Sequence, residues 1–139
     1  MIVVIDTNVL LVSVSSRSKY HWLYQLILNE QVQIAYTNEI LAEYEEQLAS
    51  HWHPDVAIAV TRSLTELPNA LSTTIYYNLR LIDKDEDDNK FVDCAFAANA
   101  DFIVTNDSHF NVLKTIDFPS IPTLRIDEFK QLLERENIL

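Results

Sequence analysis

The first strand-like run of the chain ends abruptly in an acidic residue. Ile2–Ile5 reads Ile-Val-Val-Ile with no polar alternation, and Asp6 follows it directly. A run of β-branched residues without alternation predicts a strand that is buried on both faces, as in a parallel sheet. Open parallel sheets place their ligands beyond the carboxyl ends of the strands. Asp6 is therefore predicted to lie where an α/β protein carries its chemistry.

The same pattern returns near the other end of the chain. The apolar run Phe102–Val104 is followed by Thr105, Asn106 and then Asp107. Either acid alone is explained equally well by a turn or a helix N-cap, where Asp is common. Two carboxylates that each follow a buried strand together favour a metal site at one edge of the sheet.

Length and composition bound the class of protein. The 139 residues are 48% hydrophobic and 22% charged, which is typical of one globular domain spanning residues 1–139. No apolar stretch approaches the roughly 20 residues that cross a bilayer, and the N-terminal run becomes acidic too soon for a signal peptide. We therefore expect a cytoplasmic protein without a membrane segment. The single Cys94 has no disulfide partner and is predicted to pack in the core.

The chain contains no glycine. Phosphate-binding loops and dinucleotide fingerprints need residues without a Cβ, so that the backbone can approach the pyrophosphate. The sequence therefore excludes a P-loop NTPase and a nicotinamide-dependent dehydrogenase. Positions that need a positive φ must use other residues, and Asn99 is predicted to end a helix in the left-handed conformation.

Apolar periodicity alternates between strand and helix along the chain. We expect strands at residues 2–5, 32–36, within 74–82, at 102–104 and at 122–124. We expect helices at residues 20–29, from an N-cap at Thr37 through Leu48, from Pro54 to about Leu67, at 90–99 and at 127–135. Strands that alternate with helices imply an α/β fold in which a parallel sheet is covered on both faces.

The segment before the helix at 90–99 is dense in acids from Asp83 to Asp88. A solvated loop with one helix-capping acid explains part of this charge, and a bound cation would explain the rest. Asp93 lies within the otherwise apolar helix, where a buried carboxylate needs a partner. Five residues of helix separate Asp88 and Asp93 by about 140°, so both reach one site only if Asp88 lies in the non-helical turn before it.

The formal net charge of −11 argues by itself against a nucleic-acid partner. That argument weakens if several of the acids hold divalent cations, because the ions would cancel much of the charge at the site. Net charge therefore leaves the kind of partner open.

Four acidic blocks in this order resemble the PIN-domain family. They are Asp6 in Asp-Thr-Asn, Glu43 in Ile-Leu-Ala-Glu-Tyr, Asp88 with Asp93 at the start of the helix, and Asp107 in Val-Thr-Asn-Asp. The resemblance covers nearly the whole chain and is strongest to VapC-type proteins, the toxins of toxin–antitoxin pairs.

The resemblance implies a metal-dependent endoribonuclease with a three-layer α/β/α Rossmann-like sandwich around a central parallel sheet. It also implies one or two Mg²⁺ or Mn²⁺ ions and an antitoxin as partner. Asn99 and Asn106 depart from relatives that often have glycine there, which affects loop geometry and removes no ligand. The residues that match the family comprise the catalytic acids Asp6, Glu43, Asp88 and Asp107, the additional metal acid Asp93, and the supporting residues Thr7, Asn8 and Thr105.

The donor types agree with that chemistry. Carboxylate oxygens suit Mg²⁺ or Mn²⁺, and the chain has no His and Cys set that would complete a zinc site. Bound ions would activate water and stabilise charge on the phosphate during hydrolysis. His109 follows Asp107 closely and is expected to face solvent rather than contact a phosphate.

Two other classes of protein compete with a nuclease. A haloacid dehalogenase-like phosphatase also begins with an acid after its first strand, but it needs a second Asp where this chain has Asn8. A catalytically silent PIN-fold module that binds RNA or a protein would be expected to have lost acids, and this chain keeps them.

Partners follow from the same features. The chain has no dense basic groove, so we expect single-stranded RNA, whose flexible phosphates can enter a recessed site. Its aromatic residues exceed what one small core can hold, which favours a homodimer that also offers a groove to the antitoxin. These aromatic residues are Tyr20, Trp22, Tyr24, Tyr44, Trp52, Tyr76 and Tyr77.

Overall fold

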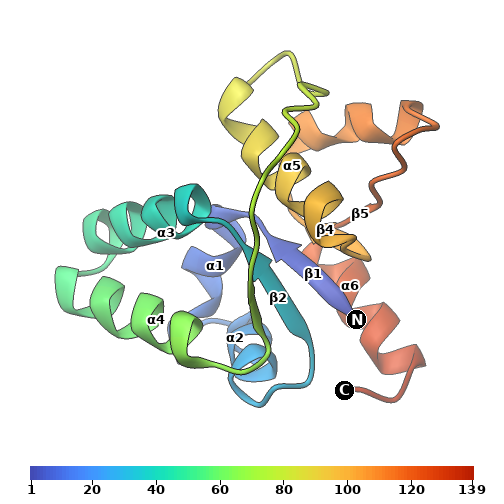
Figure 1. Cartoon of the computed structure of the whole chain (residues 1–139). Helices are drawn as coiled ribbons and strands as arrows, with labels where there is room; N and C mark the ends of the chain where they lie inside the picture. The colour runs from blue at the N-terminus through green and yellow to red at the C-terminus, as the bar shows by residue number, and fades with distance from the viewer.

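The computed structural model describes all residues 1–139 and contains one sheet of 5 parallel strands in the order β3-β2-β1-β4-β5 (Figure 1). β1 lies in the middle, and Val3, Val4 and Ile5 have no exposed surface. This confirms the prediction that the unbroken apolar run at residues 2–5 forms a strand buried on both faces. The strands are β1 (Ile2–Ile5), β2 (Gln33–Tyr36), β3 (Ala70–Ser72), β4 (Phe102–Val104) and β5 (Thr123–Leu124).

Helices cover both faces of the sheet (Figure 1). On one face α5 packs against β1, β2 and β4, and its Phe91 ring lies 6.4 Å from the Phe110 ring of η2. On the other face α2 meets α6 through the Trp22 and Phe129 rings, 6.4 Å apart. The predicted three-layer α/β/α sandwich is confirmed. The helices are α1 (Thr7–Ser13), α2 (His21–Leu28), α3 (Asn38–His51), α4 (Pro54–Glu66), η1 (Glu86–Asp88), α5 (Asn89–Ala98), η2 (Ser108–Thr115) and α6 (Ile126–Arg135).

Most helix boundaries follow the signals in the sequence. The Thr37 side chain accepts a hydrogen bond from the Ile40 N–H at 3.1 Å and caps α3. Pro54 occupies the first turn of α4, where its missing N–H costs nothing. Asn99 ends α5 with a φ of 51°, as predicted for a chain without glycine. Cys94 is buried in α5, which confirms its place in the core.

The prediction of a strand within residues 74–82 is wrong. The strand that pairs with β2 is β3, which begins earlier at Ala70, and no helix or strand covers residues 73–82. The β-branched and aromatic residues there have no neighbouring strand to pair with, and Tyr76 is 82% exposed. Side chains of α5 hold this segment instead, because Asn89 bonds both the N–H and the C=O of Ile82.

Helix α1 directly after β1 was not predicted. Its apolar residues Val9, Leu10 and Leu11 continue the apolar run of β1, so periodicity alone does not separate the two elements. No helix in the structure is both long and apolar enough to cross a membrane.

Candidate metal centre

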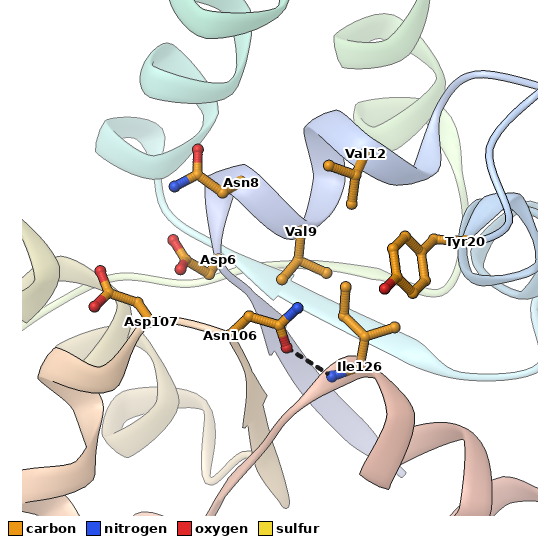
Figure 2. A pocket seen from close by; sticks show the side chains of 8 residues that line it. All are labelled: Asp6, Asn8, Val9, Val12, Tyr20, Asn106, Asp107 and Ile126. Carbon is orange, nitrogen blue, oxygen red and sulfur yellow. Dashed lines mark hydrogen bonds between the residues drawn. The ribbon is translucent and has the colours of Figure 1, made fainter.

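The two acids that follow β1 and β4 lie at the same edge of the sheet. The strands are parallel neighbours with Ile5 opposite Val104, so Asp6 and Asp107 extend from adjacent carboxyl ends. The Asp6 N–H donates to the Val104 C=O at 3.1 Å, which continues the ladder to the first acid. Both side chains line one cleft, and Figure 2 shows their carboxylates near each other.

Thr105 connects these two acids. Its hydroxyl donates to Asp6 Oδ2 at 2.8 Å and accepts from the Asp107 N–H at 3.0 Å. Burial, together with the charges of Asp88 and Asp107, raises the pKa of Asp6 to about 6, although the Thr105 hydrogen bond acts in the opposite direction. The Asp6 carboxylate therefore lacks a compensating positive charge, and a cation beside it would lower its pKa again.

The third acid comes from the turn before α5. Asp85 caps this turn, η1, and Asp88 at its end is buried in the cleft. Burial and the charges of Asp85 and Asp107 raise the pKa of Asp88. His109 lies with Nδ1 3.3 Å from Asp88 Oδ2 and opposes this rise. His109 is partly exposed, as expected, but the prediction missed that its ring also contacts a candidate ligand.

Glu43 reaches the cleft from α3 with both oxygens engaged. The Thr7 hydroxyl donates to one oxygen, and Lys90 Nζ lies 2.9 Å from the other. Lys90 has a buried side chain and also donates to the C=O of Asp87 at 2.8 Å. Burial lowers the pKa of Lys90, but the hydrogen bond and charge of Glu43 outweigh it and raise that pKa above its usual value. The charge of Glu43 is therefore matched from within the chain.

No lysine or arginine pairs with Asp6, Asp88 or Asp107. These acids line one cleft of about 160 Å³, and beside it ligand atoms of Asp85, Asp88 and His109 lie within 4.8 Å of one another. Burial and neighbouring charges raise the pKa of Asp6 and of Asp88, and the charge of Asp107 acts on both. This arrangement fits a hard divalent cation such as Mg²⁺ or Mn²⁺, which takes oxygen ligands. The cleft is lined by Asp6, Thr7, Asn8, Glu43, Gln47, Asp85, Asp87, Asp88, Phe91 and Asp107.

Asp93 does not join the other acids. Its Oδ1 accepts a hydrogen bond from the Leu79 N–H at 3.0 Å, and it lines a separate cavity of about 420 Å³. Burial is the main cause that raises the pKa of Asp93. Asp88 does lie in the turn before α5, but the phase of the helix still directs Asp93 to the segment 73–82.

Several residues of the cleft were not predicted. Asp85 and Asp87 belong to the acid-rich segment, whose density of charge was the only signal that the sequence offered. Gln47 lies one turn of α3 beyond Glu43, so helical spacing from that acid would have found it. Lys90 follows Asp88 closely, but nothing in the sequence indicates its contact with a different helix.

A solved structure shares this fold. The chain is similar to a chain in the crystal structure of VapBC2 from Rickettsia felis bound to a DNA fragment from their promoter, with 18% identity and a TM-score of 0.61. That similarity covers 90% of this chain and 98% of the other, and it concerns the fold alone.

No curated protein sequence matches the chain. A family model described as PIN domain matches residues 2–109, a span that includes both strand-end acids and the turn that carries Asp88. On the strength of that match, the chain belongs to the PIN-domain family.

Proposed function

We propose that this protein is a divalent-metal-dependent endoribonuclease that hydrolyses phosphodiester bonds in single-stranded RNA. The observation that carries the proposal is that Asp6, Asp88 and Asp107 line one cleft and that none of them pairs with a lysine or arginine. Metal ions bound there would supply an activated water and stabilise charge on the phosphate. A phosphate carries negative charge, so the acids alone would repel it.

The residues of the chain divide the work of the site. Asp6, Asp88 and Asp107 would hold Mg²⁺ or Mn²⁺ through their carboxylate oxygens. Thr105 orients Asp6 by its hydrogen bond, and His109 restrains Asp88. These contacts keep the acids in place before an ion arrives, so less conformational freedom is lost on binding.

We propose that Glu43, which reaches the same cleft from α3, is the fourth catalytic acid of the site. Because Thr7 and Lys90 already bind its oxygens, its position is fixed by the protein itself. Asn8 is exposed at the rim of the cleft, where its amide would contact the RNA strand. Asp93, which was expected among the metal ligands, is left outside the proposed site.

Cleavage of a labelled single-stranded RNA with Mn²⁺ tests the proposal. We expect cleavage by the unmodified protein, its loss in EDTA, and its loss in Asp6→Asn and Asp107→Asn, which remove ligand charge. Asp117→Asn is the matched control, because Asp117 is exposed and does not line the cleft. Duplex RNA should be largely spared. Cleavage that persists in EDTA would contradict a metal mechanism, and tight metal-free RNA binding by Asp107→Asn would favour a silent binding module.

We further propose that the protein is the toxin of a toxin–antitoxin pair and acts in the cytoplasm. The similarity to a chain in the VapBC2 structure supports this proposal. Expression of the chain alone should arrest growth, and Asp107→Asn should relieve the arrest. Co-expression of the product of the adjacent upstream gene should relieve it too. Arrest by Asp107→Asn as strong as that by the unmodified chain would contradict a nuclease toxin.

A further inference from the structure

A second hollow opens directly beside the metal centre and shares Asp6 and Asp107 with it (Figure 2). Its volume is about 310 Å³, and its wall away from the acids is mainly apolar. Val12 of α1, Tyr20 before α2 and Ile126 of α6 form that wall. The hollow thus joins a cluster of carboxylates to a surface suited to a flat, uncharged group.

One polar group inside the hollow has a fixed orientation. Asn106 Oδ1 accepts a hydrogen bond from the Ile126 N–H at 3.1 Å. Because the amide oxygen is held in this way, the amide nitrogen of Asn106 is left to donate, and Figure 2 shows it directed toward Val9. The hollow therefore offers an oriented donor between an apolar wall and the acids.

We propose that this hollow is a subsite for one nucleobase of the RNA strand whose phosphate is bound at the neighbouring acids, an inference that rests on the proposed function. A base is planar and uncharged, stacks on an aromatic ring, and carries acceptors for the Asn106 amide. A second phosphate is disfavoured there, because Asp6 and Asp107 line the hollow and no lysine or arginine does.

The rim of the hollow agrees with a nucleotide strand. Lys19 Nζ lies over the Tyr20 ring, 5.0 Å from its centroid, so a positive charge stands against the aromatic group that lines the hollow. A strand whose base enters beside Tyr20 would carry its next phosphate past this ammonium group. In this arrangement the base lies in the hollow, and the RNA backbone runs along its edge.

Calorimetry with small ligands separates base binding from phosphate binding. The probes are the four ribonucleoside 5′-monophosphates and ribose 5-phosphate, which has the same sugar and phosphate without a base, all in Mg²⁺. We expect at least one nucleotide to bind about tenfold or more tightly than ribose 5-phosphate, as stacking of a base on an aromatic ring predicts. Tyr20→Ala should reduce this advantage and leave ribose 5-phosphate unaffected.

Val12→Trp gives a second, opposite test. Val12 is 40% exposed on α1, so a large side chain can fill the hollow from its edge without replacing an acid. We expect this variant to bind nucleotides no better than ribose 5-phosphate. Ile58→Trp is the control, because Ile58 is 48% exposed on α4 and does not line either site. Melting curves establish that each variant folds.

The outcomes distinguish the subsite from the function on which it rests. If the unmodified protein binds all five ligands equally, the base subsite is overturned while phosphate binding at the acids stands. The base subsite is overturned as well if Tyr20→Ala and Val12→Trp both keep the full nucleotide advantage. If neither the four nucleotides nor ribose 5-phosphate bind in Mg²⁺, the phosphate site of the proposed function fails together with the subsite.

Discussion

Among single residues, Asp6 carries the least compensated charge. Its pKa of about 6 lies above the ordinary value of 3.8, so the folded protein holds the proton more tightly than the unfolded chain. The free energy of unfolding should therefore fall as pH rises between these values, by about 3 kcal/mol for Asp6 in the absence of metal. Below this window the carboxyl is protonated in both states, and its contribution is fully present.

The Asp6→Asn variant should reveal the loss of stability that comes from the charge on the buried Asp6 carboxylate. In EDTA the variant should melt near the temperature of the unmodified protein at about pH 4 and clearly above it at about pH 7, because only the carboxylate charges. Thermal denaturation at both pH values measures the difference. Added Mn²⁺ should stabilise the unmodified protein more than the variant. A variant with the same advantage at both pH values would show that burial of the Asp6 charge does not cause it.

Lys90 and Glu43 form the internal ion pair of the site. Lys90→Met should lower the free energy of unfolding by about 2 kcal/mol, because a charged hydrogen bond is lost and Glu43 is left among other acids. Glu43→Gln in the Lys90→Met background should recover part of this loss. Urea denaturation of the single and double variants gives the coupling between the two residues.

The matched control for the ion pair is Lys84→Met. Lys84 is exposed in the same acid-rich segment and makes no ion pair, so its removal should change stability little. If Lys84→Met and Lys90→Met destabilise the protein equally, the effect comes from net charge and the contact with Glu43 contributes nothing of its own.

The candidate site could be predicted where the sequence ties a residue to the end of an element. Asp6 and Asp107 end buried strands, so the topology of a parallel sheet brings them together. Asp93 also lies in an apolar setting, but its direction depends on the rotation of α5, which sequence spacing does not settle. The contact between Lys90 and Glu43 joins α5 to α3, and no local pattern in the sequence predicts a contact between these two helices.

Among the elements, turns show how the fold manages without glycine. Four residues have positive φ, namely Glu30, Arg80, Asn99 and Asn137. Glutamate tolerates this region less well than asparagine, whose short side chain can bond locally. Glu30→Gly should therefore raise the free energy of unfolding by about 1 kcal/mol. Asn99→Gly should gain less, and urea denaturation compares the two. An equal gain would mean that the left-handed conformation of Glu30 carries no special cost.

The elements that could be predicted are those with a local signal. The positions of α3 and α4 could be predicted from the apolar period together with the N-cap Thr37 and the first-turn proline Pro54. Caps and first-turn prolines act within a few residues, so the sequence shows them directly. β3 has only Ala70–Ser72, and its three residues are intermediate or exposed, so it lacks the apolar pattern of a buried strand. Its place at the sheet edge depends on pairing with β2, which propensity cannot supply.

At the scale of the whole molecule, exposed aromatic residues bear on assembly. Tyr76 is 82%, Tyr77 71% and Phe118 86% exposed, whereas Tyr44 is fully buried. We predict a homodimer that covers part of this aromatic surface. Light scattering at tens of micromolar should give about twice the mass of one chain, and Tyr76→Ser with Tyr77→Ser should weaken the association. A monomer at that concentration would contradict the dimer.

The position of β1 in the sheet sets the order in which the molecule can be completed. β1 is synthesised before β4, but the pairing of these strands and the Thr105 hydrogen bond to Asp6 join positions 99 residues apart. Contacts between such distant positions form late. A growing chain on the ribosome therefore carries Asp6 long before Asp107 exists to meet it. The proposed nuclease would therefore stay inert while the ribosome builds the chain from β1 to β4, because its site is complete only after Asp107 has been added.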